Sequence, residues 1–463
     1  MPLWTWAELC DALALPMPER IGPNVQGISI DSRTTVPGDL FVALAGDPGP
    51  RFNVSYRSGR DGHDFIPAAA AEGAVGALVH RASPAAELPT LQVADTLEGL
   101  WQLGRAARTR LACPVIAVTG SSGKTTCKSF LAAALNGFAT AGSLNNHLGV
   151  PLSLARTPRN ATAAVYEIGM NHPGEIAPLA ALVQPDIAVV LNVQDAHREN
   201  FPDPDGIRQE KLSICAGLRP GGVLVVESSV GVDDVRPDVR IVRFGRGADC
   251  DVELLAMDDG RARYRVGAST LTAHVPGGSA HRALTLAAVL AVTLALGLDP
   301  EPATRLSDAL VPAGRGGHYR INGRLIIDDS YNANPASMAA ALRTLGATDA
   351  KRRIAVLGEM LELGPGSDAF HRELAPLCAG FDHVVCVGAG TLPLQQTLQE
   401  APGETPGAAV GTVAWCSAAD ENLLTTLLAL SEPGDAILIK GSNRVFWQHA
   451  FVSRLLEALQ REQ

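Results

Sequence analysis

The residues with the clearest chemical signature form a short loop, Gly120-Ser-Ser-Gly-Lys-Thr125, which directly follows the apolar run Val115–Val118. Glycines let the backbone turn so that several amides face one anion. Lys124 adds a cation for the terminal phosphates of a nucleotide, and the Thr125 hydroxyl is a ligand type for Mg²⁺. The usual consensus has glycine at position 118, where this chain has valine. The strand–loop–helix context still predicts a phosphate-binding loop for ATP, with contacts from Thr119, Gly120, Ser121, Ser122, Gly123, Lys124, Thr125 and Thr126.

Three polar residues downstream of this loop are candidates for a reaction centre. Glu167 ends an apolar, strand-like run, and a carboxylate at a strand end near a phosphate loop can ligate Mg²⁺ directly or through water. His197 follows the apolar run 187–191, and a single loop histidine is more often structural than functional. Lys211 lies in a helical stretch, where a lysine is by default solvated. Taken alone, each of the three keeps a structural role open.

Alternating strands and helices are expected to position these residues. Between residues 112 and 312, short β-branched runs alternate with helical stretches, which predicts a mostly parallel sheet around the loop. Residues 251–275 break the rhythm, because the arginines between Arg261 and Arg265 alternate with apolar residues after Asp259-Gly260. This pattern is typical of a β-hairpin with a solvated face. A second α/β unit follows and lacks the Gly-x-Gly-x-x-Gly pattern of dinucleotide binding.

These patterns predict an α/β protein of three domains. We expect a small N-terminal α/β domain at 1–111, a central ATP-binding domain with a β-hairpin extension at 112–312, and a Rossmann-like domain at 313–463. Expected strands lie at residues 27–30, 39–44, 115–118, 163–168, 187–191, 223–226, 324–328, 353–357, 383–387 and 436–439. Expected helices lie at residues 65–72, 96–109, 124–135, 285–298 and 445–459.

Composition limits the class of protein further. The chain has 463 residues, 46% hydrophobic and 19% charged, which fits a globular protein with substantial cores. Its net charge of −10 argues against a duplex-DNA binder. The eight cysteines form no Cys-x-x-Cys pair and indicate reduced thiols, while the N-terminus lacks the cationic start of a signal peptide. The apolar stretch 285–298 is too short for a bilayer, so we expect a cytoplasmic protein with no nucleic-acid or membrane partner.

Several strings, taken in order, resemble the Mur ligases over nearly the whole chain. Resemblance to their central domain rests on Val118–Thr126, Asn145–Pro151, Glu167–His172, Leu191–Val193, Ala196-His197 and Lys211. Resemblance to their N-terminal UDP-sugar domain rests on Asp31–Arg33, Pro37–Leu44 and Asp61–Phe65. The C-terminal strings Asp328–Pro335, Val356–Gly364 and Ile439–Ser442 are similar to those of family members that add D-alanyl-D-alanine.

The resemblance implies an ATP-dependent carboxylate–amine ligase of peptidoglycan synthesis. Its expected substrates are UDP-N-acetylmuramoyl-tripeptide and D-alanyl-D-alanine, joined through an acyl phosphate by a monomeric enzyme with two Mg²⁺ ions. The implied catalytic residues are Lys124, Lys211, His197 and Glu167. The implied metal ligands are Thr125, Glu167, His197 and a carbamylated Lys211. Arg315 and Asp329 would reach ATP from the C-terminal domain, and substrate contacts are implied for Ser32, Arg33, Asn145, Asn146, Asn332, Asn334, Lys440 and Ser442.

The sequence departs from the family pattern at three places. Where members usually show His-Asn-x-x-Asn, this chain has His281-Arg282-Ala-Leu-Thr285, which leaves the adenine contacts open. Ser122 replaces a common asparagine. The stretch 48–60 is longer than usual and carries Arg51, Arg57 and Arg60, which predicts a surface loop near the UDP site. Hinges between domains are expected at 112–114 and 312–314.

Two other kinds of function remain open at this point. The first is a related ligase that adds diaminopimelate or lysine, or a folylpolyglutamate synthase, and the string Tyr331–Pro335 speaks against both. The second is a P-loop regulator that binds nucleotide without ligation. The sequence identifies neither the general base nor the third residue of the tripeptide.

Overall fold

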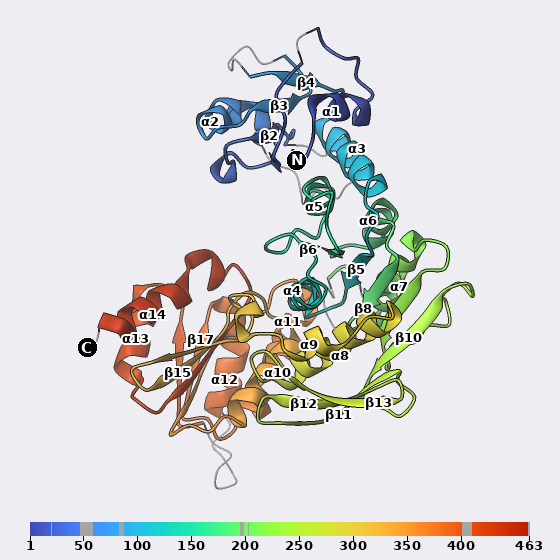
Figure 1. Cartoon of the computed structure of the whole chain (residues 1–463). Coiled ribbons are helices and arrows are strands. Elements are labelled where there is room, and N and C mark those ends of the chain that lie inside the picture. The colour runs from blue at the N-terminus through green and yellow to red at the C-terminus, as the bar shows by residue number, and fades with distance from the viewer. Residues whose placement is uncertain are drawn as a thin grey trace.

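The computed structural model describes residues 1–19, 21–46, 59–82, 88–194, 199–201, 203–400 and 410–461. Its strands form three separate sheets, one in each third of the chain, and helices cover them (Figure 1). The central and C-terminal parts lie against each other, while the N-terminal part stands at the end of helix α3, away from the C-terminal part (Figure 1). The predicted α/β class is confirmed, and the exact domain limits stay a prediction.

The N-terminal sheet has four parallel strands in the order β1-β2-β3-β4. Its strands are β1 (Gly27–Ser29), β2 (Asp39–Val42), β3 (Gly76–Val79) and β4 (Thr90–Gln92). Its helices are α1 (Trp6–Ala12), α2 (Ile66–Ala71) and α3 (Thr96–Thr109). Asp95 caps α3 by accepting from the amides of Leu97 and Glu98, so this helix begins where the sequence predicted. The Trp101 indole on α3 donates to the carbonyl of His147, which ties this part to the central one.

The central sheet has nine strands in the order β13-β12-β11-β10-β9-β8-β5-β7-β6. They are β5 (Val115–Thr119), β6 (Phe138–Ala139), β7 (Ala164–Glu167), β8 (Ile187–Val190), β9 (Val223–Glu227), β10 (Arg240–Gly245), β11 (Val252–Asp258), β12 (Arg261–Val266) and β13 (Ser269–His274). Every residue of β5, β7 and β8 is buried, as expected for parallel strands with helices on both faces. The helices are α4 (Lys124–Ala134), α5 (Gly149–Ala155), α6 (Ile176–Val183), α7 (Pro204–Leu212), α8 (Ala280–Ala295) and α9 (Glu301–Thr304).

The β-hairpin extension predicted at 251–275 is present, and it contains three strands where a single hairpin has two. Strands β11, β12 and β13 form an antiparallel group at one edge, and β10 joins it to the parallel strands. Arg261 and Arg263 are exposed, which confirms the solvated face. The apolar stretch predicted as a buried helix begins earlier than expected, at Ala280, and packs as α8 against α4 and the neighbouring strands. This earlier start places Arg282 in its first turn.

The C-terminal sheet has six strands in the order β14-β15-β19-β16-β17-β18, and β14 alone runs antiparallel to its neighbour. The strands are β14 (Gly317–Ile321), β15 (Arg324–Asp329), β16 (Arg353–Gly358), β17 (His383–Val387), β18 (Thr412–Cys416) and β19 (Ala436–Lys440). The helices are α10 (Pro335–Gly346), α11 (Ser367–Arg372), α12 (Leu392–Glu400), α13 (Glu421–Leu430) and α14 (Phe451–Arg461).

The final helix differs from its prediction. The sequence predicted a helix from residue 445, but α14 begins at Phe451. A 3₁₀ turn spans Trp447–His449, and Ala450 is left-handed with φ +48°, which interrupts helical hydrogen bonding before residue 451. No helix in the described part of the chain has the length and apolarity that a bilayer crossing requires.

Candidate functional site

The predicted phosphate loop lies between the carboxyl end of β5 and the first turn of α4. Gly123 precedes the helix with φ +81°, a conformation that glycine adopts without the steric cost of a side chain. The turn directs the amides at the start of α4 toward a cavity, which is the arrangement that binds phosphate. The Nζ of Lys124 bends back over the loop and donates to the carbonyl of Gly120 at 2.8 Å.

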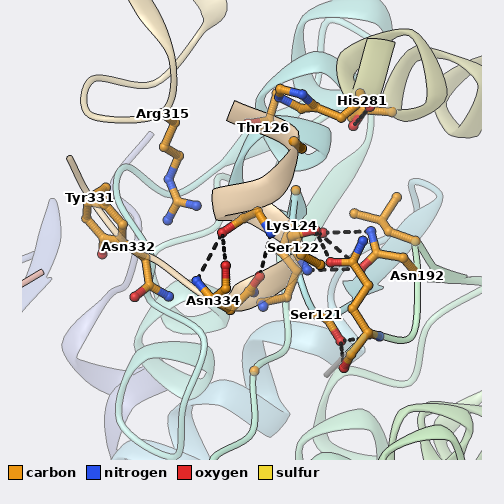
Figure 2. Close-up of a pocket in the computed structure, with 18 of the residues that line it drawn as sticks. Ser121, Ser122, Lys124, Thr126, Asn192, His281, Arg315, Tyr331, Asn332 and Asn334 are labelled. Atoms are coloured by element: carbon orange, nitrogen blue, oxygen red, sulfur yellow. Dashed lines mark hydrogen bonds between the residues drawn. The ribbon is translucent and has the colours of Figure 1, made fainter. Parts of the chain in front are cut away.

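A second segment braces this loop from the neighbouring strand. Asn192, just after β8, accepts from the amide of Ser121 through its carbonyl at 3.2 Å. Its side-chain Oδ1 accepts from the amide of Ser122 at 3.0 Å (Figure 2). The Ser121 hydroxyl donates to the carbonyl of Gln194 at 3.1 Å. Sequence reasoning gave Asn192 no role, although a polar residue directly after the buried run 187–191 was the available signal.

Glu167 lies at the end of β7, beside the phosphate loop. Its Oε2 accepts from the Thr125 hydroxyl at 2.9 Å, and its Oε1 accepts from the Asn145 amide at 2.7 Å. The carboxylate is 2% exposed. Because β5 is hydrogen-bonded to both β7 and β8, the three carboxyl ends meet at one edge of the sheet. The structure therefore brings together Thr125 and Glu167, which were expected as ligands of one metal site, and adds Asn145, which was expected only as a substrate contact.

A buried lysine that sequence reasoning missed completes this cluster. The Nζ of Lys128 on α4 lies 3.7 Å from Oε2 of Glu167 and donates to the carbonyl of Gly142. Burial lowers the pKa of Lys128, while the Glu167 carboxylate acts in the opposite direction and favours the cation. The pair keeps charge balanced between two buried side chains. Its position one helical turn after Lys124 was the signal in the sequence.

The opposite side of the site comes from the C-terminal domain. Asp329 ends β15 and Lys440 ends the adjacent β19. The Lys440 Nζ donates to Oδ2 of Asp329 at 2.7 Å and to the carbonyl of Asn332 at 3.0 Å. The guanidinium of Arg315 stacks over the Tyr331 ring, 4.1 Å from its centroid, and donates to the Ser143 hydroxyl at 3.0 Å. Ser143 in turn shares a hydrogen bond of 2.9 Å with Thr125, so Arg315 reaches the phosphate-loop cluster.

Both sides enclose one cavity of about 630 Å³. That volume lies in the range of small-molecule sites. Figure 2 shows Lys124, Ser121 and Ser122 on one side, and Arg315, Tyr331 and Asn332 on the other. The predicted residues that line the cavity are Ser121, Ser122, Gly123, Lys124, Thr126, Asn145, Asn146, Glu167, Arg315, Asp329, Asn332, Asn334 and Lys440.

Two of these asparagines also hold backbone in place. The Oδ1 of Asn146 accepts from the amides of Leu148 and Gly149 at the start of α5. Asn334 caps α10 by accepting from the amide of Ser337 at 2.8 Å. Their side-chain oxygens are therefore committed to helix starts, although both residues line the cavity.

Other predicted residues lie elsewhere. Ser32 and Arg33 form a 3₁₀ turn in the N-terminal domain, where Asp31 pairs with the exposed Arg33 side chain. The hydroxyl of Ser442 accepts from the Leu361 amide at 2.9 Å, and Ser442 is outside the described lining of the cavity. Thr119 and Gly120 are also outside the described lining of the cavity. His197 lies outside the described residues, as do residues 48–58 of the predicted surface loop.

Lys211 on α7 is buried, contrary to the default of a solvated lysine. Its exposed fraction is 1%, and its Nζ contacts Sδ of Met170 at 3.9 Å. Burial holds the pKa of Lys211 well below its ordinary value, and the Lys124 cation lowers it further. The neighbouring Glu210 carboxylate points to the amides of Gly174 and Ile176.

The segment His281–Thr285 at the start of α8 lines the cavity beside Thr126 (Figure 2). The surrounding protein and the adjacent Arg282 cation lower the pKa of His281 to about 4, so its ring is neutral near pH 7. The Thr285 hydroxyl donates to the His281 carbonyl at 3.1 Å. The Arg282 guanidinium donates to the backbone carbonyls of Gly277, Arg315 and Gly316.

A phosphate loop on a parallel sheet, a buried acid beside its threonine, and a facing domain that presents Arg315 and Lys440 together define a nucleotide-dependent P-loop enzyme. Residues 118–274 match the family description "Mur ligase middle domain", and residues 314–443 match "Mur ligase, glutamate ligase domain". A relative from Rickettsia prowazekii (strain Madrid E), named UDP-N-acetylmuramoyl-tripeptide–D-alanyl-D-alanine ligase, is 30% identical over 462 residues, covering 96% of this chain and 98% of its own. The chain belongs to the Mur ligase family.

Further comparisons agree. The Escherichia coli (strain K12) protein of the same name is 34% identical over 386 residues, which cover 79% of this chain and 82% of that one. A crystal structure of MurF from Acinetobacter baumannii is 30% identical with a TM-score of 0.79, over 98% of this chain and 99% of that one. The MurF ligase from Thermotoga maritima, solved in complex with ADP, is 26% identical with a TM-score of 0.75, over 94% and 98%.

Proposed function

We propose that this chain joins D-alanyl-D-alanine to UDP-N-acetylmuramoyl-tripeptide, converting ATP to ADP and phosphate and producing a peptidoglycan precursor. The observation that carries this proposal is one cavity with the phosphate loop on one side and Arg315, Asp329 and Lys440 on the other. Relatives that cover nearly the whole chain bear this activity in their names. The cytoplasm is the proposed compartment, since it supplies ATP and keeps the eight cysteines as the free thiols seen here.

The reaction must overcome the poor reactivity of a carboxylate. An oxygen of the tripeptide carboxylate attacks the γ-phosphorus of ATP, and the bond from that phosphorus to the bridging oxygen breaks to release ADP. The amine of D-alanyl-D-alanine, after losing a proton, attacks the acyl carbon of the resulting acyl phosphate. The bond to the phosphate oxygen then breaks, and phosphate leaves with the electron pair. The protein's contribution is positioning and charge neutralisation.

The residues of the cavity divide this work by position. The loop amides and Lys124 hold the terminal phosphates, with Asn192 fixing the shape of the loop. Arg315 approaches the same end from the C-terminal domain and offsets negative charge on the transferring phosphoryl oxygens. Lys440, oriented by Asp329, lies at the C-terminal side, where its cation suits the carboxylate of the incoming dipeptide. The expected contacts of Asn145, Asn146, Asn332 and Asn334 with the peptides belong to the same proposal.

The cluster at Thr125 has the donor set that Mg²⁺ prefers. A hydroxyl and a carboxylate oxygen lie 2.9 Å apart there. Neighbouring ligands of an octahedral ion with bonds of about 2.1 Å lie about 3 Å apart, so the two oxygens fit one ion. Mg²⁺ held by Thr125 and Glu167 would neutralise phosphate charge. A second ion, with His197 and Lys211 as ligands, is part of the proposal and follows the family pattern.

We also propose that Lys211 is carbamylated. Its amine is buried and its pKa is held well below the ordinary value, which favours the uncharged amine that can act as a nucleophile. The nitrogen attacks the carbon of CO₂, a nitrogen–carbon bond forms as one carbon–oxygen π bond opens onto oxygen, and the nitrogen loses one proton to solvent. The carbamate places an anion near the Lys124 cation, which suits a site that binds cations.

A carbon-13 experiment tests this modification. Wild-type protein equilibrated with ¹³C-bicarbonate should show one carbamate resonance, and Lys211→Ala should lack it and lose activity that short carboxylates partly restore. Lys351→Ala, at an exposed lysine, is the control and should keep the resonance. Wild-type activity that is independent of bicarbonate, without a carbamate signal, would contradict carbamylation.

A panel of amines tests the ligase function itself. Purified protein with ATP, Mg²⁺ and UDP-N-acetylmuramoyl-tripeptide is offered D-alanyl-D-alanine, diaminopimelate, lysine or glutamate. Phosphate release should require both the nucleotide sugar and D-alanyl-D-alanine, and the product should gain the mass of the dipeptide. Release with diaminopimelate, lysine or glutamate would favour a related ligase, and nucleotide binding without release would favour a regulator.

A further inference from the structure

Arg282 occupies a fitted socket at the junction between the central and C-terminal domains. It lies in the first turn of α8 and is 2% exposed. Its Nη1 donates to the carbonyl of Gly277 at 2.8 Å. Its Nη2 donates to the carbonyls of Arg315 and Gly316, both at 2.7 Å. One guanidinium therefore ties the start of α8 to the chain segment that enters the C-terminal sheet.

Two glycines make room for this guanidinium. Gly277 and Gly316 have φ of +68° and +78°, a left-handed conformation that favours glycine. A Cβ added to Gly277 would lie 2.1 Å from Nη1 of Arg282, and one added to Gly316 would lie 2.3 Å from Nη2. Both contacts are too short for real atoms, so a side chain at either position would have to displace the guanidinium.

The residue held by this socket carries a functional side chain. Arg315 offers its carbonyl to Arg282 and sends its guanidinium onto Tyr331 and the Ser143 hydroxyl. Tyr331 is itself fixed, because its amide donates to the Gly314 carbonyl at 2.8 Å and its ring packs on Trp447. The direction of the Arg315 side chain thus depends on the backbone between Gly314 and Gly316.

We propose that Arg282 is a positioning residue that holds this junction so that the Arg315 guanidinium lies beside the phosphate loop. The inference rests on the proposed contact of Arg315 with the transferring phosphoryl group. Because the Nη1 and Nη2 atoms of Arg282 already donate to three carbonyls, this role is exerted through Arg315 and not by donation from those atoms to ATP. Its loss should impair the chemical step, through Arg315, more than the binding of nucleotide.

A double-mutant cycle tests the dependence on Arg315. Arg282→Met should lower kcat by roughly 100-fold, the cost of misplacing a catalytic group by about 1 Å, with KM for ATP nearly unchanged. Arg315→Ala should lower kcat at least as much. The double variant should be no slower than Arg315→Ala alone. Once the Arg315 side chain has been removed, loss of the residue that positions it has no further effect on kcat. Arg282→Lys should recover part of kcat, because an ammonium still donates to carbonyls.

Glycine variants provide a second way to displace the Arg282 guanidinium without replacing Arg282. Gly277→Ala should displace the guanidinium and lower kcat as Arg282→Met does. Gly297→Ala is the matched control, because φ is +66° there and no atom lies within 4 Å of an added Cβ. Arg324→Met controls for loss of a buried arginine, since Arg324 donates to Ser431 within the C-terminal domain. Both controls should lower thermal stability without a selective loss of kcat.

Amide exchange separates failure of this inference from failure of the proposed function. Exchange of the segment 312–320 should be faster in Arg282→Met than in wild type, whether or not ligation is detected. Additive effects in the double variant, or unchanged kcat and exchange in both Arg282→Met and Gly277→Ala, would overturn the positioning role. If the wild-type protein is inactive but Arg282→Met still exchanges faster than wild type, the ligase function is overturned and the structural role of Arg282 remains.

Discussion

Glu167 shows which properties of a site residue can be predicted from its type and its place in the sequence. A carboxylate at a strand end near a phosphate loop predicted a metal ligand, and the structure places its Oε2 2.9 Å from the Thr125 hydroxyl. The burial of Glu167 and its neighbour Lys128 could not be predicted, because both depend on how α4 packs against β7. Metal binding by Glu167 stays a prediction.

Replacing the Glu167 carboxylate with an amide removes its negative charge and keeps the shape of the side chain. Glu167→Gln should lower kcat by roughly 100-fold or more and raise the Mg²⁺ concentration needed for half-maximal rate, because a hard cation binds an amide oxygen more weakly. The rate is measured across a Mg²⁺ titration. Glu253→Gln, on the exposed hairpin where Glu253 pairs with Arg265, is the control and should behave as wild type. A wild-type Mg²⁺ profile in Glu167→Gln would remove this residue from the site.

Asparagine is the residue type that the sequence could least resolve. Asn146 and Asn334 were predicted to contact substrate, and both line the cavity. Each also accepts backbone amides at the start of a helix. Asparagine is favoured at helix caps for the same hydrogen-bonding chemistry that suits it to binding sites, so the sequence cannot separate the two roles.

At the scale of elements, buried parallel strands were the most predictable. The strands at 115–119, 187–190 and 353–358 follow from continuous β-branched or apolar runs that both faces of a covered sheet require. Sequence reasoning missed β3, β4, β6, β10, β14 and β18. Of these, β4, β6, β14 and β18 lie at sheet edges, whereas β3 and β10 lie inside their sheets. A short edge strand carries too few buried residues to give a clear pattern.

The loop after β16 depends on a buried histidine. His371 on α11 is fully buried, its Nε2 accepts from the Met360 amide at 3.0 Å, and its Nδ1 donates to the Ser367 carbonyl at 2.7 Å. This arrangement requires a neutral ring. Burial lowers the pKa of His371 below the ordinary value of 6.5. The loop leads to Glu362, which lines the cavity.

This lowered pKa predicts a pH dependence of stability. In the unfolded chain the His371 ring binds a proton near its ordinary pKa. In the folded protein the same ring binds a proton only at a lower pH. The stability contributed by the neutral ring is therefore complete above about pH 6.5 and is lost as pH falls toward the folded pKa, by at most about 1.4 kcal/mol per pH unit.

Melting temperatures between about pH 7.5 and about pH 5.5 check this prediction. His371→Gln keeps an acceptor for the Met360 amide and should show a shallower fall than wild type. His449→Gln, at an exposed histidine, should follow wild type. Parallel curves for His371→Gln and wild type would show that His371 does not control this transition.

At the scale of the whole molecule, the sequence predicted three α/β parts but not the contacts between them. Arg315 with Ser143 and Arg282 with the carbonyls near 315 each join residues far apart in the chain. Such contacts depend on how domains dock, which local patterns do not encode. Ser32 and Arg33 lie in the N-terminal part and are outside the described lining of the cavity. The predicted hinges at 112–114 and 312–314 stay predictions.

The most direct test of the account follows oxygen atoms through the reaction. The carboxylate of UDP-N-acetylmuramoyl-tripeptide that becomes the new amide is labelled with ¹⁸O, and ligation to D-alanyl-D-alanine is run with unlabelled ATP and water. Because the carboxylate oxygen that attacks phosphorus stays on that phosphorus, every phosphate released should carry one ¹⁸O by mass spectrometry. Pentapeptide formed with phosphate free of ¹⁸O would contradict transfer of the γ-phosphoryl group to the substrate in this cavity.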